Sequence, residues 1–291
     1  MDFAFETKTR EMLDGELVSL ENKLNGDLLY YNGNIFASLE NIIKKVVEDL
    51  KAKDCEQKLD RKTLYLVLTT PGGDVGTVER IVNIIRHHYE IVNFIIPDMA
   101  MSAGTVLALS GDDIFMSYAS SLGPIDPQIC NAKNEWVPVK GYLSKVEEML
   151  EKARENKLTD VEFALLRDLD LAQLSQYEQD CKLTTDLLTK WLVKYKFKNW
   201  NTHNSSRKIV TVEEKEKRAT EIAEKLGDNS IWLSHGRFIN IQRLQNELGL
   251  IIQDYGTLPW CEMLETYCEM IQDYHQTRKT NWSLHTRTII I

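Results

Sequence analysis

The sequence predicts an α/β fold with a parallel sheet, and three observations support this prediction. Residues 64–68 (LYLVL) and 91–96 (IVNFII) are almost continuously apolar, as are strands that are buried on both faces. Between them, residues 75–85 carry valines and isoleucines at helical spacing. Strand and helix alternate in this way as far as residue 118, which is the order of right-handed βαβ crossovers. We therefore expect a parallel sheet with helices on both faces.

The other elements follow from the same periodicities. Ahead of the first βαβ unit we expect a polar, partly helical lead-in (1–25), a strand (27–31) that an Asn-Gly-Asn turn closes, and an amphipathic helix (36–53). After it we expect a strand (113–118), a helix from 138, helical segments (158–198 and 212–226), a short helix near 244–248 and an amphipathic tail. We divide the chain into a core (1–157), a helical insertion (158–230) that serves as a lid or in oligomerisation, and a closing C-terminal segment (231–291) packed on the core.

Composition indicates an ordinary globular protein. Of 291 residues, 43% are hydrophobic and 27% charged, which excludes an intrinsically disordered chain. A net charge of −9 argues against nucleic acid as the main partner. The five cysteines form no CxxC pair, and neither a signal sequence nor an apolar run of about 20 residues occurs. With no HExxH, Walker or GxGxxG motif either, we expect a cytoplasmic protein without metal, cofactor or membrane span.

Two strand-to-helix corners carry the residues that suggest chemistry, TTPGGD at 69–74 and AMSAGT at 100–105. In open parallel sheets, active sites collect at the carboxyl ends of strands. A double glycine lets the backbone approach a substrate closely, and Ser102 begins a helix whose N–H groups are free. Alone, the glycines are explained by a turn and Ser102 by a helix cap. Together they favour acyl transfer, in which Ser102 attacks a carbonyl and the N–H groups of Gly73 and Ala103 receive the oxyanion.

Three stretches carry a family resemblance: TPGGDVGTVERI, PDMAMSAGTVLALSGDDIFM and SSLGPIDPQ. Together they resemble the serine dehydrogenase proteinase family of the Clp-protease/crotonase superfamily, which is similar to the signal peptide peptidase A type. The resemblance is strong over 64–130 and looser over 26–63 and 234–252. It implies a core of repeated β-β-α units, a PGG loop that supplies oxyanion donors (Gly72 and Gly73 here), and Ser102 as nucleophile. The segment near 158–230 has no counterpart that we recognise.

The general base is where the sequence departs from the Clp pattern. Clp proteases have a histidine about two dozen residues after the serine, whereas Asp126 occupies that place here. Signal-peptide-peptidase-like relatives use a lysine, which works as a base only when its surroundings lower its pKa from ~10.4 towards ~7–8. Lys140, at a predicted helix start, resembles their lysine, and Lys145 lies one turn further along. A solvated surface lysine remains the alternative for both.

Several further residues have a catalytic and a structural interpretation. Asp126 either tunes such a base or belongs to a turn, and His235 either is the base or makes a structural hydrogen bond. Asp74 is expected to cap the helix that follows it. The stretch 191–200 alternates cations with aromatics, which is typical of nucleic-acid surfaces and also of a helix that covers an active-site mouth.

The leading hypothesis is a serine endopeptidase that acts on peptide or protein substrates without a cofactor. The alternatives are a catalytically silent assembly or binding module with this fold, and a crotonase-like acyl-CoA enzyme. We also expect a homo-oligomer, because members of this superfamily associate, and the apolar face of 75–85 and the C-terminal helices offer surfaces for that association.

Overall fold

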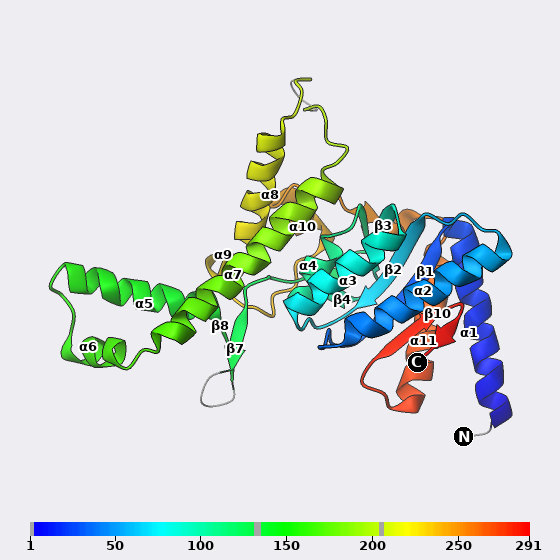
Figure 1. Ribbon diagram of the computed structural model, residues 1–291, viewed down its shortest axis with the longest axis horizontal. Coiled ribbons are helices and arrows are strands. Elements are labelled where there is room, and N and C mark those ends of the chain that lie inside the picture. The colour runs from blue at the N-terminus through cyan, green and yellow to red at the C-terminus, as the bar shows by residue number, and fades with distance from the viewer. Residues whose placement is uncertain (1–2, 131–134, 204–206) are drawn as a thin grey trace.

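A seven-stranded sheet forms the centre of the molecule (Figure 1). The structure is a computed structural model that describes residues 3–130, 135–203 and 207–291. Across the sheet the strands are β11 (Ile289–Ile290), β10 (Ser283–Thr286), β1 (Asp27–Asn32), β2 (Thr63–Thr69), β3 (Ile91–Ile96), β5 (Asp113–Met116) and β9 (Gln253–Asp254). From β1 to β9 each neighbouring pair is parallel, whereas β10 and β11 are antiparallel. The predicted α/β fold with a largely parallel sheet is confirmed.

Helices cover both faces of this sheet, as its apolar strands require. One face packs against α2 (Leu39–Gln57), α3 (Val75–His88) and α4 (Ala103–Ala108). The other packs against α1 (Phe3–Leu24) and α11 (Cys261–Arg278). Within β1 the side chains alternate between the two cores, Leu28 and Tyr30 on one side and Leu29 and Tyr31 on the other. Every residue of this strand except its last is therefore buried.

The N-terminal lead-in is more ordered than the sequence suggests. It forms the 22-residue helix α1, in which Leu13, Leu17 and Leu20 are fully buried. These three leucines share one face of the helix and pack in the same core as α11. The expectation of a polar, partly helical segment is therefore corrected to a packed core helix.

The C-terminal strands were not predicted. In β10, Leu284 pairs with Tyr31 of β1, so the chain returns to the sheet about 250 residues after leaving that strand. Just beyond β10, the Arg287 guanidinium forms ion pairs with Glu21 (2.6 Å), Asp27 (2.7 Å) and Asp54 (2.6 Å). These contacts join the hairpin β10–β11 to the first 54 residues of the chain.

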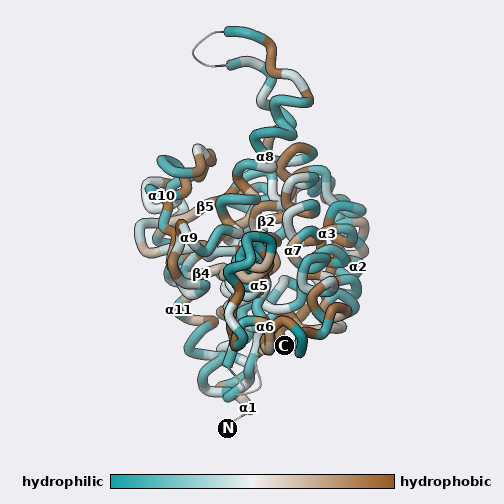
Figure 2. The backbone as a smooth tube through the Cα atoms, turned by 90° about the vertical axis from the view of Figure 1, so that its left-hand side faces the viewer, coloured by the Kyte–Doolittle hydropathy of each residue, from teal (hydrophilic) through white to brown (hydrophobic). Residues whose placement is uncertain are grey.

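The rest of the chain is mostly helical, as predicted for 158–198 and 212–226. An arm made of α5 (Val139–Arg154), α6 (Asp160–Arg167) and the first half of α7 (Leu171–Trp191) extends from the body in Figure 1, and Figure 2 views the molecule from its tip. The other elements are the small sheets β4 (Met99–Ala100) with β6 (Ser121–Leu122) and β7 (Gln128–Cys130) with β8 (Trp136–Pro138), the helices η1 (Leu192–Lys196), α8 (Val212–Leu226), α9 (Asn229–Trp232) and α10 (Ile241–Asn246), and the turn η2 (Tyr255–Thr257). Among the described residues, no helix has both the length and the apolar character that crossing a membrane requires.

Candidate active site

The two strand-to-helix corners lie side by side at the carboxyl ends of β2 and β3. Thr70 and Ala100 form a parallel bridge between them. The Thr70 N–H donates to the Met99 carbonyl (2.9 Å), and the Met101 N–H donates to the Thr70 carbonyl (2.9 Å). This short ladder continues the pairing of the sheet past the ends of the strands and holds Ser102 next to the glycine loop.

Gly72 and Gly73 are required by backbone geometry. Both have positive φ angles, 114° and 147°. A Cβ on Gly72 would lie 2.9 Å from the Ser102 Cβ, and one on Gly73 would lie 2.0 Å from the Ile35 carbonyl oxygen. Ile35 forms a parallel bridge with Gly73. The Ile35 N–H donates to the Gly72 carbonyl, and the Asp74 N–H donates to the Ile35 carbonyl, both at 2.8 Å. In such a parallel bridge the N–H of Gly73 itself faces away from Ile35.

Ser102 has an unusual backbone conformation. It directly precedes α4 with φ 51° and ψ −118°. Such a conformation costs a non-glycine residue roughly 1–3 kcal/mol and concentrates at functional sites. Ser102 occupies the N-cap position of α4, but within the described part of the chain its side chain makes no capping hydrogen bond. Ala103 is the first helical residue, and its N–H therefore precedes the first intrahelical hydrogen bonds.

Thr105 connects this corner to the segment that follows β6. Its hydroxyl lies 2.7 Å from the Ala100 carbonyl oxygen and 2.9 Å from the Gly123 carbonyl oxygen, and the Gly123 N–H donates to it at 2.9 Å. A Cβ on Gly123 would lie 2.5 Å from the Met101 side chain. The loop 123–126 is therefore packed directly against the Ser102 corner.

Asp126, at the end of that loop, is fully buried and paired with a histidine. Its Oδ1 lies 2.9 Å from Nδ1 of His235, whose side chain is only 14% exposed. With its side-chain nitrogen turned towards Asp126, the amide of Asn229 donates to both carboxylate oxygens (2.9 and 3.2 Å). The two open interpretations of Asp126 and His235 thus converge on one buried hydrogen-bonded pair, in which Asp126 fixes the orientation of the imidazole ring.

The two candidate lysines lie in different surroundings. Lys145 is 75% exposed and forms an ion pair with Glu148 at 2.7 Å, so it is a surface lysine. Lys140 is partly buried in the first turn of α5, and its Nζ would be 3.0 Å from a Cβ at Gly227. Gly227 ends α8 and Asn229 begins α9 two residues later, so Lys140 approaches the segment that contacts Asp126. In the part of the chain that the structure describes, the Lys140 ammonium group has no hydrogen bond or ion pair.

Ser102 is not hydrogen-bonded to any candidate base. Among residues 3–130, 135–203 and 207–291, its hydroxyl has no hydrogen-bond partner. Catalytic hydrogen bonds are often long or absent before substrate binds, so this geometry leaves the choice of base open. Within the same residues, no group of His, Cys, Asp or Glu side chains is arranged to hold a metal ion.

Two of the sequence interpretations have structural answers elsewhere. Asp74 does cap α3, because its carboxylate accepts a hydrogen bond from the Thr77 N–H (2.6 Å). The stretch 191–200 does not cover the serine corner. Lys196 and Lys198 at its end contact Asp112 and Asp113, which lie at the amino end of β5, opposite the end where Ser102 lies.

Thr105 and Asn229 were missed in the sequence. Thr105 follows Ser102 by three residues, a spacing that suggests a helix interior and gives no sign of a link to Gly123. Asn229 follows Asp228, which caps α9, and this cap is the only local signal. Both act on residues more than a dozen positions away, which periodicity does not reveal.

Comparisons with known proteins place the chain in a family. Residues 41–190 match the sequence profile of the ClpP-like SDH-type serine proteinases. Two uncharacterized proteins of Methanocaldococcus jannaschii are 40% identical over 68 residues and 41% identical over 64 residues. These matches span 23% and 22% of this chain and 24% and 22% of the archaeal proteins, which is less than a quarter of their length.

A comparison with solved structures also found two mutants of one protease. One is a serine-to-alanine mutant of the 1510-N membrane-bound stomatin-specific protease, with 11% identity and a TM-score of 0.46, covering 78% of this chain and 79% of that one. Another is a lysine-to-alanine mutant of the same protease in complex with a substrate peptide, with 13% identity and a TM-score of 0.45, covering 78% and 75%.

Proposed function

Because the chain belongs to the family of ClpP-like SDH-type serine proteinases, we propose that it cleaves peptide bonds in a peptide or protein substrate through an acyl-enzyme on Ser102. The observation that carries this proposal is the backbone of Ser102, which is strained, part of no side-chain cap and in contact with Gly72. A serine in a turn or a cap has no need of such a conformation. A nucleophile at a sharp strand-to-helix turn does, because the turn presents its hydroxyl to the substrate.

The reaction follows from the groups around this corner. A base takes the hydroxyl proton of Ser102, and Oγ attacks the carbonyl carbon of the scissile peptide. The N–H groups of Gly73 and Ala103, beside Gly72, donate to the oxyanion, and each such donor lowers the barrier by about 3–4 kcal/mol. The protonated base then gives its proton to the leaving amine. Water, activated by the same base, attacks the acyl-enzyme and releases the second product.

Lys140 is our choice for the base. Lys140 is partly buried in the first turn of α5, and in the described part of the chain its ammonium group makes no hydrogen bond or ion pair. Lys140 lies close to Gly227, two residues before Asn229, which bonds to Asp126. The loop 123–126 in turn contacts the Ser102 corner through the hydrogen bond between Thr105 and Gly123. On this proposal Asp126 and His235 act as positioning residues that hold this turn in place.

His235 is the second candidate, on a different observation. A carboxylate bonded to Nδ1 orients an imidazole so that Nε2 is left to accept a proton, which is the arrangement that serine hydrolases use. Loss of His235 should then remove activity as completely as loss of Ser102, and the neutral His235→Gln variant would separate the two candidates.

A fluorophosphonate probe tests the proposal directly, because it reacts only with an activated serine. The wild-type protein should be labelled at one site, which peptide mapping should place at Ser102, and Ser102→Ala should not react. Lys140→Met should reduce the labelling rate at least ~100-fold, the usual effect of losing a general base. Lys145→Met is the matched control, with the same substitution on the same helix, and should label as the wild type does.

Three results would redirect the proposal. If Lys140→Met labels normally while His235→Gln does not, the base is His235. If the folded wild-type protein is neither labelled nor active on peptides, the catalytically silent alternative is favoured. If a coenzyme A thioester is turned over and Ser102→Ala retains that activity, the crotonase-like alternative is favoured.

We further propose that the protein works as a homo-oligomer, and that the arm provides the contact. The face of α3 that suggested association in the sequence packs inside the protein, with Val78, Ile81, Val82 and Ile85 buried. Exposed apolar side chains lie on the arm instead, namely Val161, Phe163, Leu165 and Leu171. The insertion 158–230 would then serve in oligomerisation. The division into three segments and the cytoplasmic location remain predictions.

A further inference from the structure

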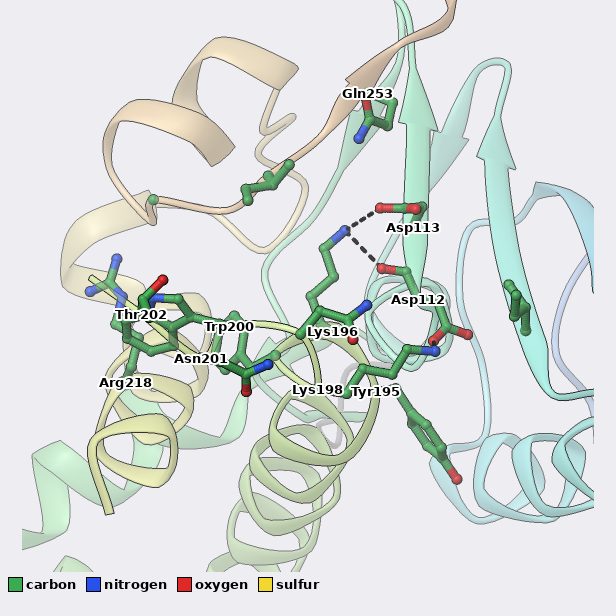
Figure 3. A pocket seen from close by; sticks show the side chains of 15 residues that line it. Asp112, Asp113, Tyr195, Lys196, Lys198, Trp200, Asn201, Thr202, Arg218 and Gln253 are labelled. Carbon is green, nitrogen blue, oxygen red and sulfur yellow. Dashed lines mark hydrogen bonds and ion pairs between the residues drawn. The ribbon is translucent and has the colours of Figure 1, made fainter. Parts of the chain in front are cut away.

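A cavity of about 730 Å³ lies between the helical insertion and the amino end of the sheet (Figure 3). Its floor includes Ile91 and Asp113, the first residues of β3 and β5. The segment 195–202 forms one side of it, and Arg218 of α8 lies at the end beside Gly249. Ser102 follows the opposite, carboxyl end of β3, so this cavity is separate from the proposed active site. Its volume is typical of sites for small organic ligands.

The side chains that line this cavity carry an excess of positive charge. Its lining holds three cations, Lys196, Lys198 and Arg218, and two carboxylates, Asp112 and Asp113. Arg218 is paired with Glu221 of the same helix, outside the lining (3.2 Å). Asp112 is already held by Arg86 from outside the cavity (2.7 Å) as well as by Lys198. Asp113 is therefore the only carboxylate in the lining that is not already doubly paired. An anionic ligand would balance the remaining charge.

Lys196 is the most deeply buried of these cations. Its side chain is only 4% exposed, and burial lowers the pKa of its ammonium group. Nζ has two partners in the described residues, the Asp112 carbonyl at 3.2 Å and the Asp113 carboxylate at a long 3.5 Å. An ammonium group has three donors, so one is left over in a place where water has little access. A ligand anion would satisfy this donor and stabilise the charge.

The backbone that positions Lys196 is irregular. At η1 the helix continuing from α7 becomes a π-helix, and the Phe197 N–H donates to the Leu192 carbonyl at 2.8 Å. Short π segments are rare and frequently found at functional sites. Tyr195 is held by the Arg86 guanidinium, 3.7 Å from its ring centre. The π turn thereby fixes the residue next to Lys196 against the core.

Aromatic surface lies next to these charges. Trp200 and Phe197 both line the cavity and pack edge to face with ring centres 5.6 Å apart. In Figure 3, Trp200 lies between Lys196 and Arg218. Flat rings stack on such side chains, whereas an inorganic anion gains nothing from them.

We propose that this cavity binds a small organic anion with a flat aromatic ring, whose anionic group contacts Lys196 and whose ring packs on Trp200. Carboxylates and phosphate esters share this chemistry. The ligand would bridge the insertion and the sheet, and it would therefore stabilise the way in which the two pack together.

Calorimetric titration of the full chain tests this proposal with four matched probes. Naphthyl phosphate and naphthoate combine ring and charge, whereas inorganic phosphate and naphthol each supply one of the two. We expect the first two to bind with Kd values of ~100 µM or lower, and phosphate and naphthol to bind at least tenfold more weakly. Whichever of the two organic anions binds more tightly identifies the natural ligand as a phosphate ester or a carboxylate. The same titration on Ser102→Ala keeps the result independent of the proposed peptidase activity.

Matched variants assign the site. Lys196→Met and Trp200→Leu should each weaken binding of naphthyl phosphate at least tenfold. Lys194→Met changes the same charge on the same π turn, and Trp136→Leu removes an indole on β8; neither residue lines the cavity, so both should bind like the wild type. Circular dichroism and thermal melting confirm that each variant is folded. The proposal is overturned if no organic anion binds the wild type, if phosphate alone binds as tightly, or if folded Lys196→Met retains full affinity.

Discussion

The backbone of Ser102 is the residue-scale feature from which most of the functional argument starts. Its φ of 51° is easy for glycine and costly for serine. The rest of the corner, held by the Thr70–Ala100 bridge and by Thr105, imposes this conformation. The conformation thus lowers the stability of the fold at the residue that we propose as the nucleophile.

Ser102→Gly should therefore stabilise the protein while abolishing its reactivity. We expect the free energy of unfolding to rise by about 1 kcal/mol, because glycine adopts a positive φ without strain. Urea denaturation measures the change, and the fluorophosphonate probe should show no labelling. The matched control is Ser144→Gly, on the exposed face of α5. It should lower the free energy of unfolding by about 0.5–1 kcal/mol. Equal losses in both variants would contradict our interpretation of the backbone.

Asp112 is a residue whose ionisation links several elements. Burial alone would raise its pKa, but hydrogen bonds from Lys198, the Val92 N–H and Arg86 outweigh burial, and the net effect lowers the pKa. A carboxylate with a lowered native pKa stabilises the fold above its unfolded pKa of about 3.9, and this contribution disappears as the pH falls through the native pKa.

Asp112→Asn should therefore cost about 3–5 kcal/mol of unfolding free energy near neutral pH, because Arg86, 8% exposed, loses its charged partner. The difference from the wild type should shrink below about pH 4, where Asp112 of the unfolded chain becomes protonated, and should be smallest below the lower native pKa. Denaturation curves at several pH values measure both effects. Asp168→Asn, at a carboxylate that is 74% exposed, is the control and should change little at any pH. A difference that stays constant down to acid pH would rule out this account.

At the scale of elements, the glycine loop after β2 is the connection most sensitive to substitution. Gly73→Ala would place a Cβ 2.0 Å from the Ile35 carbonyl oxygen, at a φ of 147°. Backbone atoms cannot move away as a flexible side chain can. We expect a loss of at least ~3 kcal/mol in unfolding free energy, or failure to fold.

Gly76→Ala is the control for this loop. A Cβ there would meet only the Asp74 side chain, at 3.4 Å, in the first turn of α3. Alanine is a better helix former than glycine, so this variant should be neutral or more stable by up to about 1 kcal/mol. Thermal melting of both variants measures the contrast. Similar melting temperatures for the two would show that the loop tolerates a side chain at Gly73.

The elements predicted from sequence are those whose own residues carry the signal. Strands β2 and β3 are long apolar runs, and α3 has a regular apolar face, so both type and order were recognised. Strands β10 and β11 are only 4 and 2 residues long, and β10 contains Ser, His and Thr. β10 is a strand because it pairs with the edge of β1, and β11 is one because it pairs with β10. Their own residues do not contain this information.

The candidate site divides in the same way. The glycines and Ser102 are adjacent to strands and have recognisable local patterns, so their positions were predicted before the fold was known. The partnership of Asp126 with His235 joins residues 109 positions apart. Lys145 pairs with Glu148, whereas Lys140 has no ion pair within residues 3–130, 135–203 and 207–291. This contrast likewise depends on packing and not on their shared helix.

At the scale of the whole molecule, the arm exposes apolar side chains that nothing in the described chain covers. Helix α6 lies away from the body in Figure 1. Phe163 of α6 is 60% exposed, and Leu171, the first residue of α7, is 73% exposed. Apolar side chains gathered on a projecting element are typical of a surface that another protein covers.

Light scattering coupled to gel filtration should therefore give a mass that is a multiple of the monomer mass. A double substitution, Phe163→Asp with Leu171→Asp, should shift the protein to the monomer. The variant should still unfold in one cooperative thermal transition, which shows that the monomer is folded. Phe5→Asp, at a side chain on α1 that is 66% exposed, is the control and should leave the assembly unchanged. A monomeric wild type at micromolar concentration would exclude the assembly that we propose.

The return of β10 to the edge of β1 has a consequence for how the protein is made. Ribosomes add about 5–20 residues per second. The roughly 250 residues between these two paired strands therefore take about 12–50 s to synthesise. Throughout that time β1 has an open edge, and Glu21, Asp27 and Asp54 lack their ion pairs with Arg287. A nascent chain with an exposed apolar strand is a preferred substrate for holding chaperones, so the yield of this protein in cells should depend on chaperone supply more than on the stability of its finished fold.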